Sequence, residues 1–216
     1  MSTSSSRSIE AVAKANGNGH RWFQLYWYAY IFASGCGALM MFICKCRPRN
    51  DDVTLSILGR AKAAGFTALV VTIDAFVLGW RPHDLETGFL PLFASIGVQV
   101  GTSDPVFMQR MGETVRPDDR PDFPLDLDAF RKRVAAGGDE EAAMAAKLGN
   151  GWLQEIATGR FRTWEDLTFL RDNWDGPIVL KGIQTVEDAH AAMDARMDGI
   201  VVSNHGTLTS STSRSE

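Results

Sequence analysis

Short apolar runs that end in polar residues recur along the chain and decide its predicted architecture. Residues 66–74 (FTALVVTID), 177–182 (PIVLKG) and 200–206 (IVVSNHG) are rich in β-branched and aliphatic side chains. A fourth candidate covers residues 22–26 (WFQLY). Near-continuous Val, Ile and Leu runs are typical of strands that are covered on both faces, as in parallel sheets. The pattern therefore predicts buried strands with polar side chains at their carboxyl ends.

The segments between these runs carry helix signals. Residues 53–64 repeat apolar positions at helical spacing, and Asp51 or Asp52 can cap the start of that helix. Gly65 supplies its end. A helix is therefore expected between the strand candidates at residues 22–26 and 66–74.

Two further helices complete an alternation of strand and helix. Thr163 and Thr185 are their N-cap candidates. Lys181 and His205 are 24 residues apart, which fits one helix and two short loops between adjacent parallel strands. In barrel enzymes the polar residues that end successive strands face one common site. The candidates at these strand ends are Gln24, Tyr26, Thr72, Asp74, Lys181 and His205.

The composition fits one α/β domain. Of the 216 residues 45% are apolar, which is enough to bury one substantial core. The net charge of −4 leaves no basic footprint for nucleic acid. Cys36, Cys44 and Cys46 form an odd set with no nearby histidine and no Cys-x-x-Cys pair, which argues against a zinc site or a disulfide framework. We expect no bound metal and an intracellular setting, cytoplasmic or organellar.

Both ends of the chain have compositions typical of disorder. Residues 1–18 begin with the Ser-rich MSTSSSRS, which lacks the apolar region of a secretory signal. Residues 207–216 (TLTSSTSRSE) have no apolar periodicity. We therefore expect disordered tails at both ends and a folded domain over residues 19–206.

Four segments together point to one family. They are WFQLYW, GFTALVVTIDAFVLGWRPHDLETGFLP, PIVLKGIQTVEDA and DGIVVSNHG. In these segments and in their order the chain resembles the FMN-dependent 2-hydroxy acid oxidases and dehydrogenases, the group of glycolate oxidase, lactate oxidase and lactate monooxygenase. The resemblance covers residues 19–27 and 48–206, and GWRPHDLETG is most similar to the lactate monooxygenase and lactate oxidase branch. It implies an incomplete TIM (β/α)8 barrel with about four central βα units.

The resemblance also implies an FMN cofactor and the residues that hold it. Gln24, Thr72 and Lys181 would line the flavin ring. The Lys181 ammonium would lie near the edge of the ring where negative charge builds up on reduction, as an electrostatic stabiliser.

The same resemblance implies the groups that act on a small 2-hydroxy acid. Tyr26 would hydrogen-bond the substrate, and Arg81 would hold its carboxylate with forked donors. His205 would be the base that takes a proton from the hydroxy acid. Asp74 would orient the imidazole and stabilise the imidazolium that forms.

Five of these residues also have a structural interpretation. Thr72 and Asp74 could cap the loop that follows their strand, and Lys181 could be a solvated residue at a strand exit. A histidine at a strand end, such as His205, is often only a hydrogen-bonded structural residue. Arg81 could belong to a surface loop.

An uncharged stretch at residues 25–44 departs from the family. Its 20 residues and its basic flanks meet the criterion for a membrane-spanning helix. If residues 28–47 are left out, WFQLYW runs directly into PRNDDVTLS, which is how the family reads. The two interpretations are a membrane anchor and an atypical hydrophobic insertion, such as a translated intron, in the loop after a strand.

Other departures are parts of the family pattern that this sequence lacks. Thr207 and Leu208 follow SNHG, where the family has a small residue and then an arginine that helps to bind the substrate carboxylate. The family's first two strands are replaced by the Ser-rich start of the chain, and its last two strand and helix units are missing. An open sheet of this kind exposes both of its edges. We therefore expect the isolated chain to be marginally stable, to aggregate or to pair with another chain.

The long connection between the second and third strands has helical stretches at residues 101–111 and 125–148, broken by Gly137 and Gly138. In the family this connection lies over the mouth of the active site, so the glycine pair is a candidate hinge of a lid. The alternative is a solvated surface helix with a charged face.

These expectations leave three functions. The leading one is an FMN-dependent oxidoreductase that oxidises a lactate-like 2-hydroxy acid to the 2-oxo acid by His-base-assisted hydride transfer to flavin, impaired by truncation. The second is a non-catalytic barrel fragment that only associates with other subunits, including copies of itself. The third is a chain that is anchored in a membrane by residues 25–44.

Overall fold

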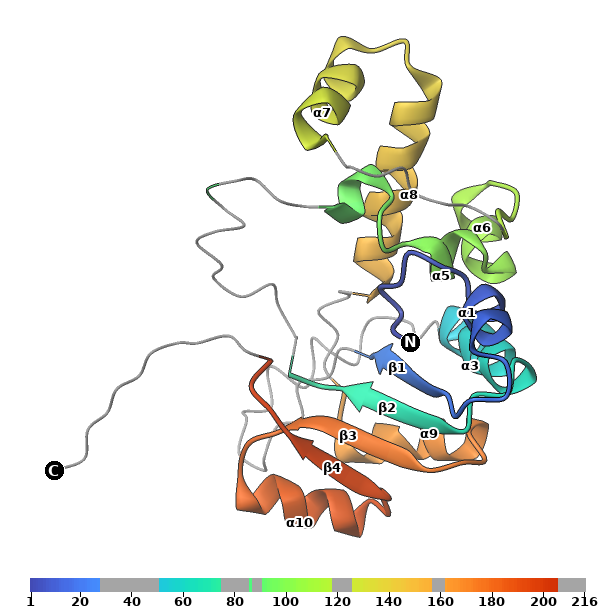
Figure 1. Cartoon of the computed structure of the whole chain (residues 1–216). Coiled ribbons are helices and arrows are strands. Elements are labelled where there is room, and N and C mark those ends of the chain that lie inside the picture. The colour runs from blue at the N-terminus through green and yellow to red at the C-terminus, as the bar shows by residue number, and fades with distance from the viewer. Residues whose placement is uncertain (28–50, 75–85, 87–90, 118–125, 157–161, 206–216) are drawn as a thin grey trace, which may run out of the picture.

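The computed structural model describes residues 1–27, 51–74, 86, 91–117, 126–156 and 162–205. Within these ranges four parallel strands form one sheet in the order β1-β2-β3-β4, and helices lie around it (Figure 1). The strands are β1 (Trp22–Tyr26), β2 (Ala68–Thr72), β3 (Ile178–Ile183) and β4 (Gly199–Val202). The helices are α1 (Ile9–Asn16), α3 (Asp52–Ala63), α5 (Gln99–Thr102), α6 (Pro105–Met111), α7 (Leu127–Ala136), α8 (Glu140–Ile156), α9 (Leu167–Asn173) and α10 (Val186–Asp194), with 3-10 turns η1 (Pro91–Ala94) and η2 (Trp164–Asp166).

The strand pairing places side chains in rows on the two faces of the sheet. Phe23 lies opposite Leu69, and Leu69 lies opposite Ile178. All three are buried in the core that the sheet shares with its helices. Because side chains alternate along a strand, the next row faces the other way. A row on this second face contains Tyr26, Thr72 and Lys181, one residue from each of three neighbouring strands.

The helices form where apolar spacing predicts them, although Asp51 at the start of α3 makes no side-chain capping hydrogen bond and binds Arg162 instead. The four apolar positions of α3, which are Val53, Ile57, Leu58 and Ala61, are all buried. Gly65 follows this helix with a φ of 76°, a conformation that favours glycine. Thr185 caps α10, because its hydroxyl accepts a hydrogen bond from the backbone N–H of Asp188 at 3.1 Å. The predicted alternation of strand and helix is confirmed in the described ranges.

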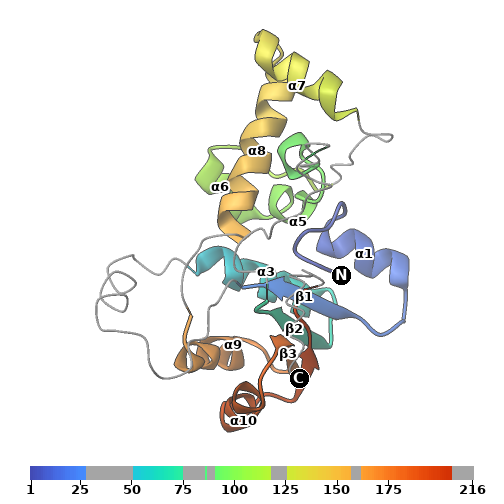
Figure 2. The same ribbon diagram turned by 90° about the vertical axis from the view of Figure 1, so that its left-hand side faces the viewer.

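The glycine pair predicted to break the long connection separates two helices. Gly137 and Gly138 have φ values of 71° and 76°, and they lie between the end of α7 and the start of α8. None of the residues of α7 is buried. Figure 2 shows α7 and the adjoining part of α8 projecting away from the sheet.

The prediction of a disordered tail over residues 1–18 is wrong. The backbone of Met1 and Thr3 exchanges hydrogen bonds with β1, through Gln24 N–H to the Met1 carbonyl at 2.7 Å and Thr3 N–H to the Gln24 carbonyl at 3.0 Å. Ser8 then caps α1, and Ile9 is fully buried. The Ser-rich composition was misleading because this segment satisfies the unpaired backbone groups at the edge of the sheet.

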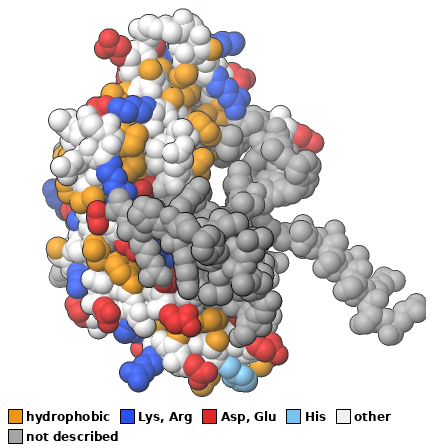
Figure 3. Space-filling view, turned by 180° about the vertical axis from the view of Figure 1, so that it is seen from behind, with side chains coloured by type: hydrophobic (Ala, Val, Ile, Leu, Met, Phe, Trp, Pro, Cys, Tyr) orange, Lys and Arg blue, Asp and Glu red, His pale blue; other side chains and the backbone are white. Residues whose placement is uncertain are grey.

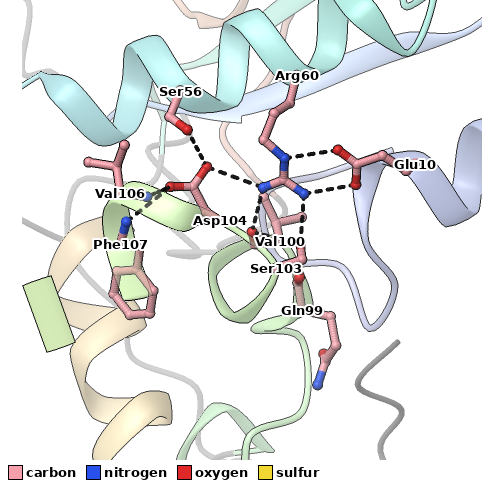
Figure 4. Close-up of polar contacts among 9 residues, drawn as sticks. All are labelled: Glu10, Ser56, Arg60, Gln99, Val100, Ser103, Asp104, Val106 and Phe107. Carbon is pink, nitrogen blue, oxygen red and sulfur yellow. Dashed lines mark hydrogen bonds and ion pairs between the residues drawn. The ribbon is translucent and has the colours of Figure 1, made fainter. Parts of the chain in front are cut away.

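A polar cluster around the buried side chain of Asp104 joins α1 and α3 to the start of α6 (Figure 4). The guanidinium of Arg60 donates to both carboxylate oxygens of Glu10, at 2.9 and 2.8 Å, and to Asp104 at 3.2 Å. Asp104 also accepts hydrogen bonds from the Ser56 hydroxyl and from the first backbone N–H groups of α6. These partners compensate for the burial of the Asp104 carboxylate.

The opposite edge of the sheet is open in the described part of the chain. There β4 pairs only with β3, and Val202 is 77% exposed. The expectation of two exposed edges therefore holds for β4 and is corrected for β1. On the face seen in Figure 3, acidic, basic and hydrophobic side chains of the described residues are interspersed.

The proposed membrane helix begins inside the sheet. Leu25 and Tyr26 are the last residues of β1, and Trp27 is buried after them. The rest of the uncharged stretch, with the predicted insertion at 28–47, lies outside the described residues, as does the predicted tail at 207–216. No helix in the described ranges is long and apolar enough to cross a membrane.

Candidate active site

Six of the seven predicted site residues lie in the described ranges, and all six are in or just beyond the strands. Gln24 and Tyr26 belong to β1, Thr72 ends β2, and Lys181 lies in β3. The remaining two, Asp74 and His205, follow β2 and β4 respectively. The seventh, Arg81, lies outside the described residues.

Two of these side chains, those of Lys181 and His205, meet at the carboxylate of Asp74. The Lys181 Nζ lies 3.0 Å from Asp74 Oδ1 and 2.8 Å from Oδ2. The His205 Nδ1 lies 2.8 Å from Asp74 Oδ1 and 3.2 Å from Lys181 Nζ. The Asp74 side chain is fully buried, whereas those of Lys181 and His205 are 22% and 18% exposed. A buried anion thus holds an ammonium and an imidazole that both reach solvent.

The surroundings of Asp74 favour its ionised form. Burial by itself raises the pKa of this carboxyl group. Hydrogen bonds from Lys181, Ser203 and His205, together with the positive charge of Lys181, outweigh burial and hold the pKa of Asp74 below its ordinary value. The carboxylate is therefore an anion at neutral pH and can stabilise positive charge on the imidazole.

The remaining predicted residues form the β1 side of the site. The side-chain amide of Gln24 donates to the Thr72 hydroxyl at 2.7 Å. The ring of Tyr26 lies edge-on to the imidazole of His205, with centroids 5.9 Å apart. The strand pairing that aligns Tyr26, Thr72 and Lys181 thus also brings the tyrosine beside the histidine.

Two residues that the sequence analysis did not single out complete the site. The Ser203 hydroxyl donates to Asp74 Oδ2 at 2.6 Å and accepts from the backbone N–H of His205 at 3.0 Å. Gly182 lies against Asp74, and a Cβ at this position would be 2.6 Å from the Asp74 Cβ. The SNHG and KGI segments contain these two residues, but nothing in the spacing shows that either contacts an aspartate more than 100 residues away along the chain.

The donor set fits a flavin better than a metal ion. An amide, a hydroxyl and an ammonium lie on neighbouring strands, and such groups match the carbonyl and N–H edge of a flavin ring. Within the described ranges, no cluster of three or more His, Cys, Asp or Glu side chains could hold a metal ion. A parallel α/β sheet with a carboxylate, an imidazole and an ammonium group at or near the carboxyl ends of its strands is the class of site found in barrel enzymes.

The family follows from comparison with known proteins. The profile of the FMN-dependent dehydrogenase family matches residues 36–215, and the chain belongs to this family. FMN is the cofactor of this family, and its members include FMN-dependent hydroxy acid dehydrogenases and oxidases. The resemblance found in the sequence segments is confirmed.

Several relatives carry names that agree with this assignment. The chain is 42% identical over 206 residues to an FMN-dependent alpha-hydroxy acid dehydrogenase of Penicillium citrinum and 41% identical over 210 residues to one of Schizosaccharomyces pombe. It is 32% identical to an L-lactate oxidase of Lysinibacillus sphaericus. Each match covers 95% of this chain but only 40 or 41% of the relative. The chain therefore spans about two fifths of the length of the curated relatives it matches.

Solved structures support the fold. The lactate oxidase of Pediococcus acidilactici matches with a TM-score of 0.53 and 27% identity, over 95% of this chain and 38% of that one. A mandelate oxidase crystallised with (S)-2-phenylpropionate matches with a TM-score of 0.52 and 28% identity, over the same shares. The four-stranded sheet and its helices are thus an incomplete TIM (β/α)8 barrel, as predicted.

Proposed function

We propose that this chain carries the hydride-transfer site of an FMN-dependent oxidoreductase that oxidises a small, lactate-like 2-hydroxy acid to the 2-oxo acid. The observation that supports the proposal is the contact of His205 with the buried carboxylate of Asp74 at 2.8 Å. A base that is oriented by a second group in this way is the recurring arrangement of general base catalysis.

The histidine would act as the base on the substrate hydroxyl. An Nδ1–H group that donates to Asp74 leaves the lone pair on Nε2, and this nitrogen would accept the hydroxyl proton. The imidazolium that forms is stabilised by the Asp74 carboxylate next to it. Tyr26 lies beside the imidazole, where its hydroxyl group would bind the substrate.

The lysine would serve the cofactor. Bound FMN would supply the acceptor for the hydride equivalent that leaves the substrate. Lys181, Gln24 and Thr72 would hold the flavin ring, and the Lys181 ammonium would offset negative charge on it. Lys181 contacts both Asp74 and His205 and is partly exposed, which suits a role that links the base to the cofactor.

The substrate class rests on the chemistry of the site and on the names of the relatives. An imidazole base beside a tyrosine, with a cation nearby, suits a small hydroxy acid anion. Arg81 would bind its carboxylate. One relative is named an L-lactate oxidase, and relatives of Vibrio parahaemolyticus and Caulobacter are named L-lactate dehydrogenases. L-lactate is therefore the first substrate to test.

The test uses the purified 216-residue chain with added FMN. Binding is measured by quenching of flavin fluorescence, and reaction is measured by anaerobic bleaching of the flavin absorbance with L-lactate. D-lactate is the control for stereochemistry, and FMN without protein is the control for background. Binding followed by bleaching with L-lactate supports the proposal. Failure of the chain to bind FMN would overturn it for this chain.

A second candidate function is association with another polypeptide without catalysis. It is favoured by the open edge of β4, where Ile200, Val201 and Val202 are 40%, 42% and 77% exposed. A strand that has one open edge and displays apolar side chains is a template for pairing with another chain. Sedimentation velocity over a range of concentrations distinguishes the two candidates, because a monomer that reduces FMN does not need a partner.

A further inference from the structure

The Ser203 hydroxyl group connects His205, the proposed base, to Asp74, the carboxylate that contacts it. It donates to Asp74 Oδ2 at 2.6 Å and accepts from the backbone N–H of His205 at 3.0 Å. Lys181 binds both carboxylate oxygens, and His205 Nδ1 lies at Oδ1. Among these neighbours, Ser203 is therefore the one whose side-chain hydroxyl contacts both the Asp74 carboxylate and the backbone N–H of His205.

The backbone of His205 has a conformation that needs support. Its φ is 62°, in the left-handed region that few residues other than glycine adopt. The hydrogen bond from His205 N–H to the Ser203 hydroxyl spans this turn. Without it, the imidazole would lose one of the contacts that set its direction relative to Asp74.

An irregularity in the sheet brings Ser203 to this position. The pairing of β3 with β4 shifts between Lys181 and Ile183, so that Val202 lies opposite Ile183 and the Ser203 N–H donates to the Ile183 carbonyl at 3.3 Å. Gly182 at the shift has a φ of 116° and packs against Asp74 without a side chain. The bulge thus places the end of β4 over the aspartate that follows β2.

We propose that Ser203 is a positioning residue that aligns His205 with Asp74 for the proton transfer, an inference that rests on the proposed function. It holds the carboxylate from one side and the backbone of the histidine from the other. A hydroxyl is needed because one group must donate and accept at the same time.

Two NMR readouts on the whole chain test these contacts without cofactor or turnover. The first is the carbon resonance of the Asp74 carboxyl group followed against pH, and the second is hydrogen exchange at the His205 amide. In Ser203→Ala the Asp74 pKa should rise, because a donor is lost while Lys181 and His205 still face the carboxylate. Exchange at the His205 amide should become faster. Ser203→Thr keeps the hydroxyl and should restore both.

Val202→Ala is the matched control, because Val202 is the exposed neighbour of Ser203 and should alter neither readout. If Ser203→Ala does not fold, Ser203→Cys supplies the comparison, because a thiol is a weak donor of similar size. Unchanged titration and exchange in Ser203→Ala would overturn the proposal, and so would failure of Ser203→Thr to restore them.

A third readout, the kinetics of FMN reduction, distinguishes failure of this proposal from failure of the proposed function. In a chain that reduces FMN with L-lactate, Ser203→Ala should lower kcat with little change in KM, because the substrate contacts remain. A parent chain that does not reduce FMN defeats the proposed function. The two NMR readouts still decide whether Ser203 holds His205 against Asp74.

Discussion

The guanidinium carbon of Arg162 lies 3.9 Å from the centre of the Trp27 ring. The same guanidinium donates to both carboxylate oxygens of Asp51, at 3.3 and 2.5 Å. Trp27 and Asp51 are the described residues on either side of residues 28–50. One buried arginine from the other half of the chain therefore contacts the residues at both ends of this segment.

This relationship predicts that residues 28–47 can be deleted. Pro48, Arg49 and Asn50 would then link Trp27 to Asp51, and a link of this length reaches about 13 Å at roughly 3.3 Å per residue. We expect a free energy of unfolding within about 2 kcal/mol of the parent, the size of the change in loop-closure entropy. Urea unfolding followed by circular dichroism measures it. A deletion variant that is unfolded under conditions where the parent is folded would show that the segment is part of the fold.

The lowered pKa of Asp74 predicts how stability depends on pH. Its folded-state pKa lies below the unfolded value of about 3.9, so the ionised carboxylate contributes stability that is present above pH 3.9 and is lost as the pH falls through the folded-state pKa. Asp74→Asn should therefore destabilise the chain at pH 7, by about 3 kcal/mol for one partner of a buried ion pair. The difference from the parent should shrink below about pH 4.

Urea unfolding at a series of pH values measures this difference. Asp175→Asn is the matched control, since Asp175 pairs with Lys62 at the surface and is 84% exposed, and it should change stability by less than about 1 kcal/mol. A difference between parent and Asp74→Asn that stays constant from pH 7 to pH 3 would contradict the role of the carboxylate.

Substitution of His205 and substitution of Lys181 should have different effects on FMN affinity and on the rate of flavin reduction. His205→Ala should slow anaerobic flavin reduction by at least about 100-fold and leave FMN affinity unchanged, because the base acts on the substrate. Lys181→Ala should weaken FMN binding and slow reduction as well, because the ammonium would serve the cofactor. Stopped-flow absorbance and fluorescence titration measure the two quantities.

His190→Ala is the control for these substitutions, because His190 is exposed on α10 away from the strand ends. Reduction at the parental rate in His205→Ala would disprove the assignment of the base. Parental FMN affinity in Lys181→Ala would remove the lysine from the cofactor site.

Gly182→Ala should destabilise the chain by about 2 kcal/mol or more. The new Cβ would lie 2.6 Å from the Asp74 Cβ and 2.7 Å from the Asp74 backbone nitrogen, and the φ of 116° is unfavourable for alanine. Gly59→Ala offers the opposite result, because nothing lies within 4 Å of its added Cβ in the middle of α3. That variant should gain about 1 kcal/mol from helix propensity. Thermal and urea unfolding of both variants would show whether close contact with Asp74 explains why position 182 is a glycine.

Much of the fold could be predicted because its signals are local. The β-branched runs of β2, β3 and β4 and the threonine caps at Thr163 and Thr185 were sufficient to predict a parallel α/β architecture. The start of the chain could not be predicted from composition. Residues 1–18 are Ser-rich, but their order depends on backbone pairing with β1 and on the burial of Ile9.

The site likewise contains residues that the sequence predicted and residues that it did not. Polar residues at strand ends were predicted to meet, and Asp74, Lys181 and His205 do so. Their proposed chemical roles stay predictions. Ser203 and Gly182 were missed because a hydroxyl or a missing side chain becomes meaningful only when its neighbour is known.

The amino-acid sequence by itself determined the strands, the helices and the polar groups at the carboxyl edge, because periodicity and capping act within a few residues. Only the tertiary structure decided that Met1 to Thr3 would cover β1, that Arg162 would contact both Trp27 and Asp51, and that Ser203 would reach Asp74. Each of these contacts joins residues far apart in the chain. They depend on the strand register, on the bulge at Gly182 and on the way the helices pack, all of which involve the whole domain.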